Sequence, residues 1–133
     1  MFRLNKIRKC VQKIRKWYYL RIVSTNRFEG SVNLLQPCIF NGDGIIEFES
    51  TILGWMYSNN FYSGTSYIEA RNKLSRIIIG KSHINNNFCC VAQDGVIRIG
   101  NDCLIGSNVS IINADFHPIS VRDRHCGGVN PKM

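Results

Sequence analysis

The chain has 133 residues, of which 44% are hydrophobic, and this is enough for one domain with its own core. Its net charge of +8 is concentrated in residues 1–27, which carry nine Lys and Arg side chains and no Asp or Glu. No apolar run reaches the ~18–20 residues that cross a bilayer, and charges interrupt the N-terminus too often for a secretory signal. The near-neutral remainder has no basic stripe and no zinc-finger or RNA-binding signature, so no nucleic-acid partner is predicted.

Residues 3–23 are predicted to form an amphipathic helix, within a basic N-terminal segment that spans residues 1–27. Apolar side chains recur at spacings of three and four and form one stripe: Leu4, Ile7, Val11, Ile14 and Tyr18. Two roles for this stripe stay open. It packs on the rest of the protein or on a sister subunit, or it lies on an anionic membrane, since basic residues beside interfacial aromatics suit such a surface.

Residues 30–56 are β-like, with a turn predicted at Gly42-Asp43-Gly44 between two apolar stretches. Residues 55–68 are aromatic and polar without a clean period. Two interpretations of this stretch stay open, a loop over a cleft and a poorly patterned part of the β region.

The most regular feature of the sequence is an isoleucine ladder, Ile99, Ile105 and Ile111, with His117 at the next sixth position. This period is typical of hexapeptide repeats, in which six residues form one side of a three-sided β coil. Ile79-Gly80 and Ile99-Gly100 open successive repeats, with extra residues predicted at Gln93-Asp94-Gly95. By the same columns His83 and Asn85 are expected to face inward, where an Asn can hydrogen-bond along the stack.

Residues 77–118 resemble the hexapeptide-repeat acyltransferases, and among them the O-acetyltransferases that modify sugars of bacterial surface polysaccharides. The segments that carry the resemblance are Ile-Ile-Ile-Gly at 77–80, Asn-Asn-Asn-Phe at 85–88, Ile-Gly at 99–100 and 105–106, and Asp-Phe-His at 115–117. The resemblance implies a mainly β fold, a left-handed parallel β-helix preceded by the amphipathic helix. It also implies a homotrimer with acetyl-CoA as co-substrate, bound between neighbouring subunits.

The resemblance further implies that His117 is the catalytic base and that Asn86 or Asn87 contacts the acceptor. In maltose-type relatives the histidine stands one residue earlier after its Ile-Gly pair. A neutral imidazole, with a reference pKa near 6.5, suits removal of a proton from a sugar hydroxyl at neutral pH. Asp115, two residues from His117, and Asp94, in the inserted turn, are candidates to orient the imidazole, and Asp94 is also a candidate substrate contact.

The expected function is therefore acetyl transfer from acetyl-CoA to a sugar hydroxyl of a surface-polysaccharide precursor, with a possible lipid-linked acceptor. Transfer to serine or an amino sugar is one alternative, and a truncated, inactive β-helix that acts only in assembly is another. Residues 28–118 are expected to form the N-terminal part of the acyltransferase domain, and residues 119–133 to begin a loop that is cut short before further coils. The six cysteines form no CxxC pair, and no metal site is expected. The expected location is the cytoplasm, either free or bound peripherally at the inner face of the membrane.

Overall fold

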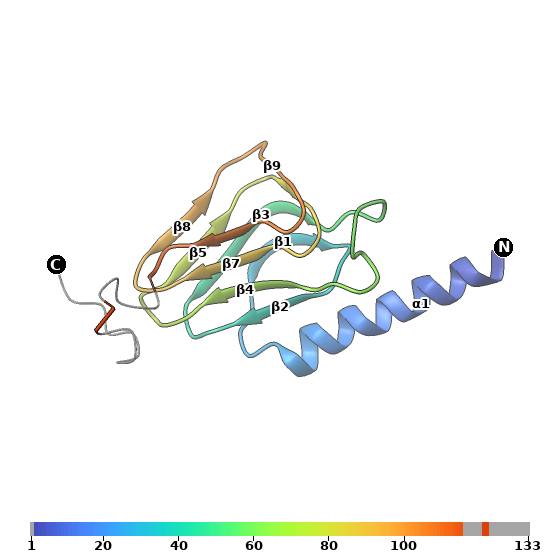
Figure 1. Ribbon diagram of the computed structural model, residues 1–133, viewed down its shortest axis with the longest axis horizontal. Helices are drawn as coiled ribbons and strands as arrows, with labels where there is room; N and C mark the ends of the chain where they lie inside the picture. Colours follow the sequence, from blue (N-terminus) through green and yellow to red (C-terminus); the bar gives the residue numbers. More distant parts are fainter. Residues whose placement is uncertain (1, 116–120, 123–133) are drawn as a thin grey trace.

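A computed structural model describes residues 2–115, 121 and 122, which form one helical segment and two parallel sheets (Figure 1). Helix α1 spans Phe2–Tyr18 and continues into a π-helical turn, η1, at Tyr19–Val23, so the predicted N-terminal helix is confirmed. No helix among the described residues is long and apolar enough to cross a membrane. Ten strands follow in chain order: β1 Glu29–Leu34, β2 Cys38–Asn41, β3 Ile45–Leu53, β4 Ser66–Ala70, β5 Arg76–Ile79, β6 His83–Ile84, β7 Cys89–Ala92, β8 Val96–Ile99, β9 Leu104–Ile105 and β10 Ser110–Ile112.

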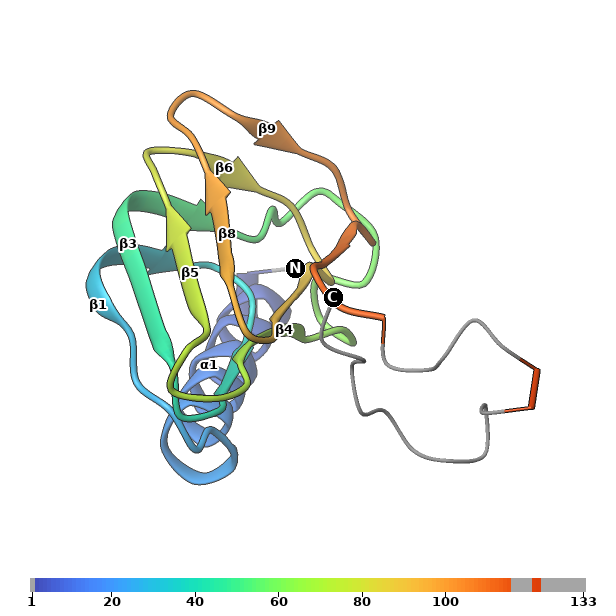
Figure 2. The same cartoon turned by 90° about the vertical axis from the view of Figure 1, so that its left-hand side faces the viewer.

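The larger sheet has six strands in the order β8-β5-β3-β6-β9, with β1 also paired to β3. Strand β3 is long enough to pair with two successive strands, β5 along Ile45–Phe48 and β6 along Ile52–Leu53. This sheet curls into half a barrel (Figure 2). The smaller sheet has four strands in the order β10-β7-β4-β2, and the strand pairs of both sheets are parallel, as the resemblance implies.

The core lies between the two sheets and is built from alternate residues of each strand, because successive side chains of a strand point to opposite faces. In β4, for example, Ser66, Ile68 and Ala70 are buried, whereas Tyr67 and Glu69 are only half-buried. Ile99 of the isoleucine ladder belongs to this core, and Ile105 and Ile111 pack against it from β9 and β10. The predicted inward direction of the ladder is therefore confirmed for these three residues.

The prediction of a left-handed parallel β-helix is wrong. The described residues form a helix and two parallel sheets, one of them a curled half-barrel, which is a mixed α/β arrangement. The six-residue period, which led to the prediction, holds only locally. The strand registers pair Arg76 with Val96, Cys89 with Ser110, Tyr67 with Cys89 and Ile45 with Arg76. The sequence interval between partners therefore differs from one pair to the next, whereas a regular three-sided coil has a constant interval.

Two irregular segments were located correctly from the sequence. Gly42 has a φ of +93° in the turn between β2 and β3, a conformation that glycine adopts at little cost. The residues Gln93-Asp94-Gly95 connect β7 to β8, where the insertion was predicted. Of the aromatic segment 55–68, residues 55–65 form a loop between β3 and β4, and residues 66–68 belong to β4.

Candidate functional site

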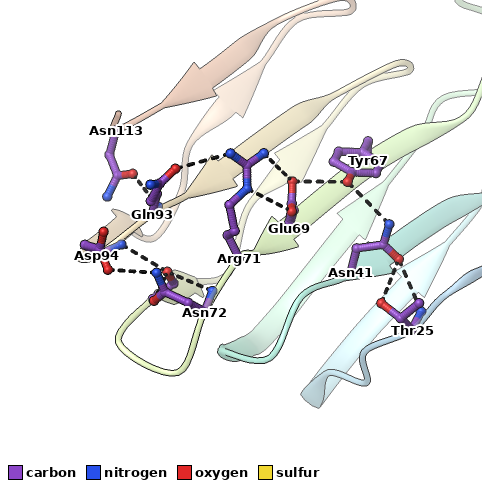
Figure 3. A network of polar contacts seen from close by, with 10 residues as sticks. Thr25, Asn41, Tyr67, Glu69, Arg71, Asn72, Gln93, Asp94 and Asn113 are labelled. Atoms are coloured by element: carbon purple, nitrogen blue, oxygen red, sulfur yellow. Dashed lines mark hydrogen bonds and ion pairs between the residues drawn. The ribbon is translucent and has the colours of Figure 1, made fainter. Parts of the chain in front are cut away.

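The outer face of the four-stranded sheet carries a continuous row of polar side chains, here called the polar strip (Figure 3). Its members come from the segment after η1, from β2 and β4, and from the ends of β4, β7 and β10: Thr25, Asn41, Tyr67, Glu69, Arg71, Gln93 and Asn113. They face outward because the alternate positions of the same strands are taken by the core. The sequence places polar residues at these alternate positions, but only strand pairing brings them into one row.

The first half of the polar strip is a chain of hydrogen bonds across β2 and β4. The Thr25 hydroxyl donates to Asn41 Oδ1 over 3.1 Å, and Asn41 Nδ2 donates to Tyr67 Oη over 3.3 Å. The Tyr67 hydroxyl then donates to Glu69 Oε2 over 3.1 Å. Partial burial is the main reason that the pKa of Tyr67 is raised, so the phenol remains a proton donor at neutral pH.

The centre of the polar strip is a two-pronged contact between Arg71 and Glu69. Arg71 Nε and Nη2 donate to the two Glu69 carboxylate oxygens over 3.0 and 3.1 Å. The hydrogen bonds from Arg71 lower the pKa of Glu69, against the opposing effect of burial. The same contact raises the pKa of Arg71. The pair is therefore fully ionised and fixes the direction of the guanidinium plane.

The polar strip ends at the carboxyl edge of the sheet. There a polar residue follows the end of each of three neighbouring strands, β4, β7 and β10. Arg71 Nη1 donates to Gln93 Oε1 over 3.2 Å, and the Gln93 backbone N–H donates to Asn113 Oδ1 over 2.7 Å. Beside them, Asn72 Nδ2 donates to Asp94 Oδ1 over 2.7 Å. Carboxyl edges of open parallel sheets are where α/β proteins commonly bind ligands, and this edge is our candidate functional site.

Two of the predicted site residues, Asp94 and Asp115, follow strands that end at this edge. Asp94 is exposed in the β7–β8 turn with a φ of +52°, which Asp tolerates better than most residues. Asp115 is exposed and follows β10 two residues after Asn113. His117, the predicted base, lies outside the described residues.

Asn86 and Asn87 lie at the opposite end of β7, so the structure does not bring them together with Asp94. The four-residue strand between them is about 13 Å long at 3.3 Å per residue. Asn86 is fully buried: its Oδ1 accepts from the Trp55 N–H, and its Nδ2 donates to the carbonyls of Trp55 and Asn59. Asn86 thus holds the β3–β4 loop, and no substrate reaches it without displacing these bonds.

Asn87 forms hydrogen bonds with residues of neighbouring turns at the same end of the sheet as Asn86. Its Nδ2 donates to Asn108 Oδ1 over 3.0 Å, and its backbone N–H donates to Gln36 Oε1 over 2.8 Å. Both Asn87 and Asn108 have positive φ angles, which explains why Asn recurs in these turns. Acceptor contact by Asn87 stays a prediction, at a place remote from the carboxyl edge.

His83 and Asn85 do not face inward, contrary to the prediction from the repeat columns. Their neighbours Ser82, Ile84 and Asn86 are the buried residues, which leaves His83 and Asn85 half-buried on the outer face. The His83 ring lies 5.3 Å from the Trp55 ring, edge to face. Both rings line a groove of about 290 Å³ together with Asn85 and Leu104. The sequence signal for this alternation is Ile84, an apolar residue between the polar residues His83 and Asn85, and the six-residue period led us to the opposite faces.

Comparison with known proteins found no relative of this chain. No family model, no curated protein and no solved structure matches the chain. In the described part of the chain, no three His, Cys, Asp or Glu side chains converge in a way that could hold a metal ion. A functional assignment therefore depends on the chemistry of the residues themselves.

Proposed function

We propose that the protein is an O-acetyltransferase that transfers the acetyl group of acetyl-CoA to a sugar hydroxyl, with His117 as the general base. The observation that carries the proposal is the polar carboxyl edge. It gathers Arg71, Gln93 and Asn113 by hydrogen bonds from three strands, and Asp115 and His117 follow Asn113 in the sequence. The resemblance of residues 77–118 to sugar O-acetyltransferases supplies the reaction type.

The chemistry asks for a base beside a polar surface that can hold a polyhydroxylated acceptor. His117 takes the proton of the sugar hydroxyl as the hydroxyl oxygen bonds to the acetyl carbon and the bond from that carbon to sulfur breaks. The proton passes to the sulfur, so that the products are the acetyl ester and the CoA thiol. Asp115 orients the imidazole and stabilises its protonated form, which is a positioning role.

The polar edge suits the acceptor because amide groups both donate to hydroxyls and accept from them, and carboxylates accept from them. Asp94 is exposed there, and Asn72 holds its carboxylate in place. A sugar of a lipid-linked surface-polysaccharide precursor is the acceptor class that the resemblance favours. A homotrimer with acetyl-CoA between subunits is part of the same proposal. The exposed apolar side chains on the outer face of the curled sheet support self-association: Ile45, Ile52, Val96 and Leu104.

The decisive experiment measures transfer of labelled acetyl from acetyl-CoA to a panel of surface glycans and their precursors. We expect His117→Ala to lose about 100-fold or more of the rate, which is the usual contribution of a general base. His125→Ala, which removes a histidine that has no role in the proposal, is the matched control. Equal transfer by wild type and His117→Ala would refute the assignment of the base.

A binding measurement separates the enzyme from a protein that acts only in assembly. Isothermal titration of the 133-residue chain with CoA is expected to show saturable binding. Absence of detectable binding, in a sample whose folding is confirmed by circular dichroism, would contradict the proposal and favour the assembly role.

A further inference from the structure

Helix α1 is attached to the sheets through polar side chains, contrary to the usual arrangement of an amphipathic helix. Gln12, which is only 5% exposed, donates from Nε2 to the Phe61 carbonyl over 3.0 Å. Lys16 Nζ donates to the Leu34 carbonyl over 2.8 Å. The side of the helix that faces the protein is therefore its hydrophilic side.

Arg15 extends this attachment to the loop between β3 and β4. Its Nη2 donates to the Gly64 carbonyl over 2.8 Å, and its Nη1 donates to the Tyr62 carbonyl and to Gln12 Oε1. Carbonyls at a loop accept from cations strongly, so these contacts fix the rotation of α1 about its axis. Figure 1 shows α1 extending beyond the strands toward its N-terminus.

This rotation leaves the apolar stripe on the outside. Ile7 and Ile14 are each 60% exposed, and Val11 and Tyr18 are also exposed. At 100° per residue, Gln12 and Lys16 lie about 140–180° around the axis from Ile7 and Ile14. Trp17 and Ile22, both exposed, lengthen the apolar surface toward η1. These four described residues of the stripe therefore do not pack on the protein's own sheets, which was one form of the packing role that the sequence left open.

Exposed basic side chains accompany the stripe. Lys6, Lys9 and Lys13 are exposed on one side of it, and Arg8 and Arg21 are exposed as well. No acidic residue occurs in residues 1–27 to neutralise them. A groove of about 430 Å³ at the end of the helical segment is lined by Arg21 and Arg27 and continues the positive surface.

We propose that α1 docks this protein on an anionic lipid surface, with the helix axis in the plane of the membrane and the apolar stripe among the acyl chains. An interfacial helix needs an apolar face, a cationic polar face and aromatic side chains at the boundary, and all three are present. A second copy of the helix is a poorer occupant, because it would bring two sets of basic residues together without an acidic partner. The proposal goes beyond the acetyltransferase assignment and does not depend on it.

Co-sedimentation of the full chain with lipid vesicles tests the proposal. We expect binding to vesicles of phosphatidylcholine with 30% phosphatidylglycerol, and at least tenfold weaker binding to vesicles of phosphatidylcholine alone. Ile7→Asn/Ile14→Asn should weaken binding to the anionic vesicles at least tenfold. Leu74→Asn is the matched control, since Leu74 is 76% exposed in the turn between β4 and β5, and it should bind as wild type.

The charge dependence gives a second readout. Each of Lys6→Gln and Lys13→Gln should weaken binding about fivefold at low salt, in line with the usual effect of one cation near an anionic surface. Trp17 fluorescence, measured in a Trp55→Phe background, should shift to the blue on anionic vesicles.

Failure of the folded wild type to bind anionic vesicles at low salt would overturn the proposal. So would equal binding by the Ile7→Asn/Ile14→Asn variant. An oligomer that this double variant dissociates, in a protein that ignores vesicles, would identify a second copy as the occupant.

Discussion

At the scale of single residues, Asn86 shows how one side chain can hold a loop that has no strand partner of its own. Its amide satisfies the Trp55 N–H and two loop carbonyls while it is fully buried. An unpaired buried polar group costs roughly as much as a lost hydrogen bond, so Asn is required there for stability.

We therefore expect Asn86→Ala to lower the free energy of unfolding by about 2–4 kcal/mol, because three hydrogen bonds are lost and buried loop groups lose their partner. Urea denaturation followed by circular dichroism measures this. Asn59→Ala, which removes an exposed amide from the same loop at a position without a positive φ, should lose less than about 1 kcal/mol. A stable Asn86→Ala protein with impaired transfer would instead support acceptor contact by Asn86.

Glu69 gives the stability of the protein a dependence on pH. Its folded-state pKa is lowered by Arg71, so the carboxylate contributes stability above its unfolded pKa. That contribution is lost as the pH falls through the folded pKa, which lies below the ordinary value of 4.5. Arg71 is partly exposed, so the effect is at most about 1 kcal/mol. Urea unfolding of wild type and Glu69→Gln should differ at pH 7 and converge toward pH 3. A constant difference across this range would contradict the prediction.

At the scale of elements, the turn between β2 and β3 depends on Gly42, whose position permits no larger residue. A Cβ at Gly42 would lie 1.9 Å from the Ala70 carbonyl oxygen, whereas a Cβ at Gly100 would meet no atom within 4 Å. Gly42→Ala is expected to cost about 2 kcal/mol or more, because it adds this clash to the strain of a positive φ. Gly100→Ala should change stability by less than about 1 kcal/mol. Thermal unfolding measures the stability of both variants. Similar losses of stability in the two variants would contradict the close contact between Gly42 and the Ala70 carbonyl.

The attachment of α1 is a second property of an element, and it depends on Gln12. Gln12→Ala removes the buried contacts to the Phe61 and Leu35 carbonyls and should loosen the helix without unfolding the sheets. Limited trypsin digestion should then cut within α1 several-fold faster than in wild type, with the sheets remaining intact. Lys9→Ala removes one exposed side chain, and this control should not accelerate cleavage at the remaining sites. Unchanged cleavage of Gln12→Ala would show that other contacts hold the helix.

At the scale of the whole molecule, local periods could be predicted from the sequence, but the arrangement of the sheets could not. The isoleucine ladder correctly indicated interior positions, and the helix period indicated α1. The six-residue columns failed at His83 and Asn85, because a shift of one residue in a strand exchanges its two faces. The polar strip joins residues as far apart as Asn41 and Tyr67, whose contact exists only through strand pairing. The pairing of β3 with both β5 and β6 could not be predicted, because no residue pattern in β3 indicates two partners.

The two-sheet core also decides how the cysteines react. Cys38 and Cys90 are buried between the sheets, and burial raises the pKa of both thiols, for Cys90 to about 12. Cys10 is exposed on α1. Because the thiolate is the reactive form, Cys10 should be labelled by a maleimide in the native protein, whereas Cys38 and Cys90 should be labelled only when the core opens. Mass spectrometry of peptides after timed labelling separates these sites. Under conditions where reclosing is slower than labelling, the rate at Cys90 should equal the rate of unfolding measured by circular dichroism. Labelling of Cys90 as fast as Cys10 would mean that the sheets do not close over it, and the core described here would then be incorrect.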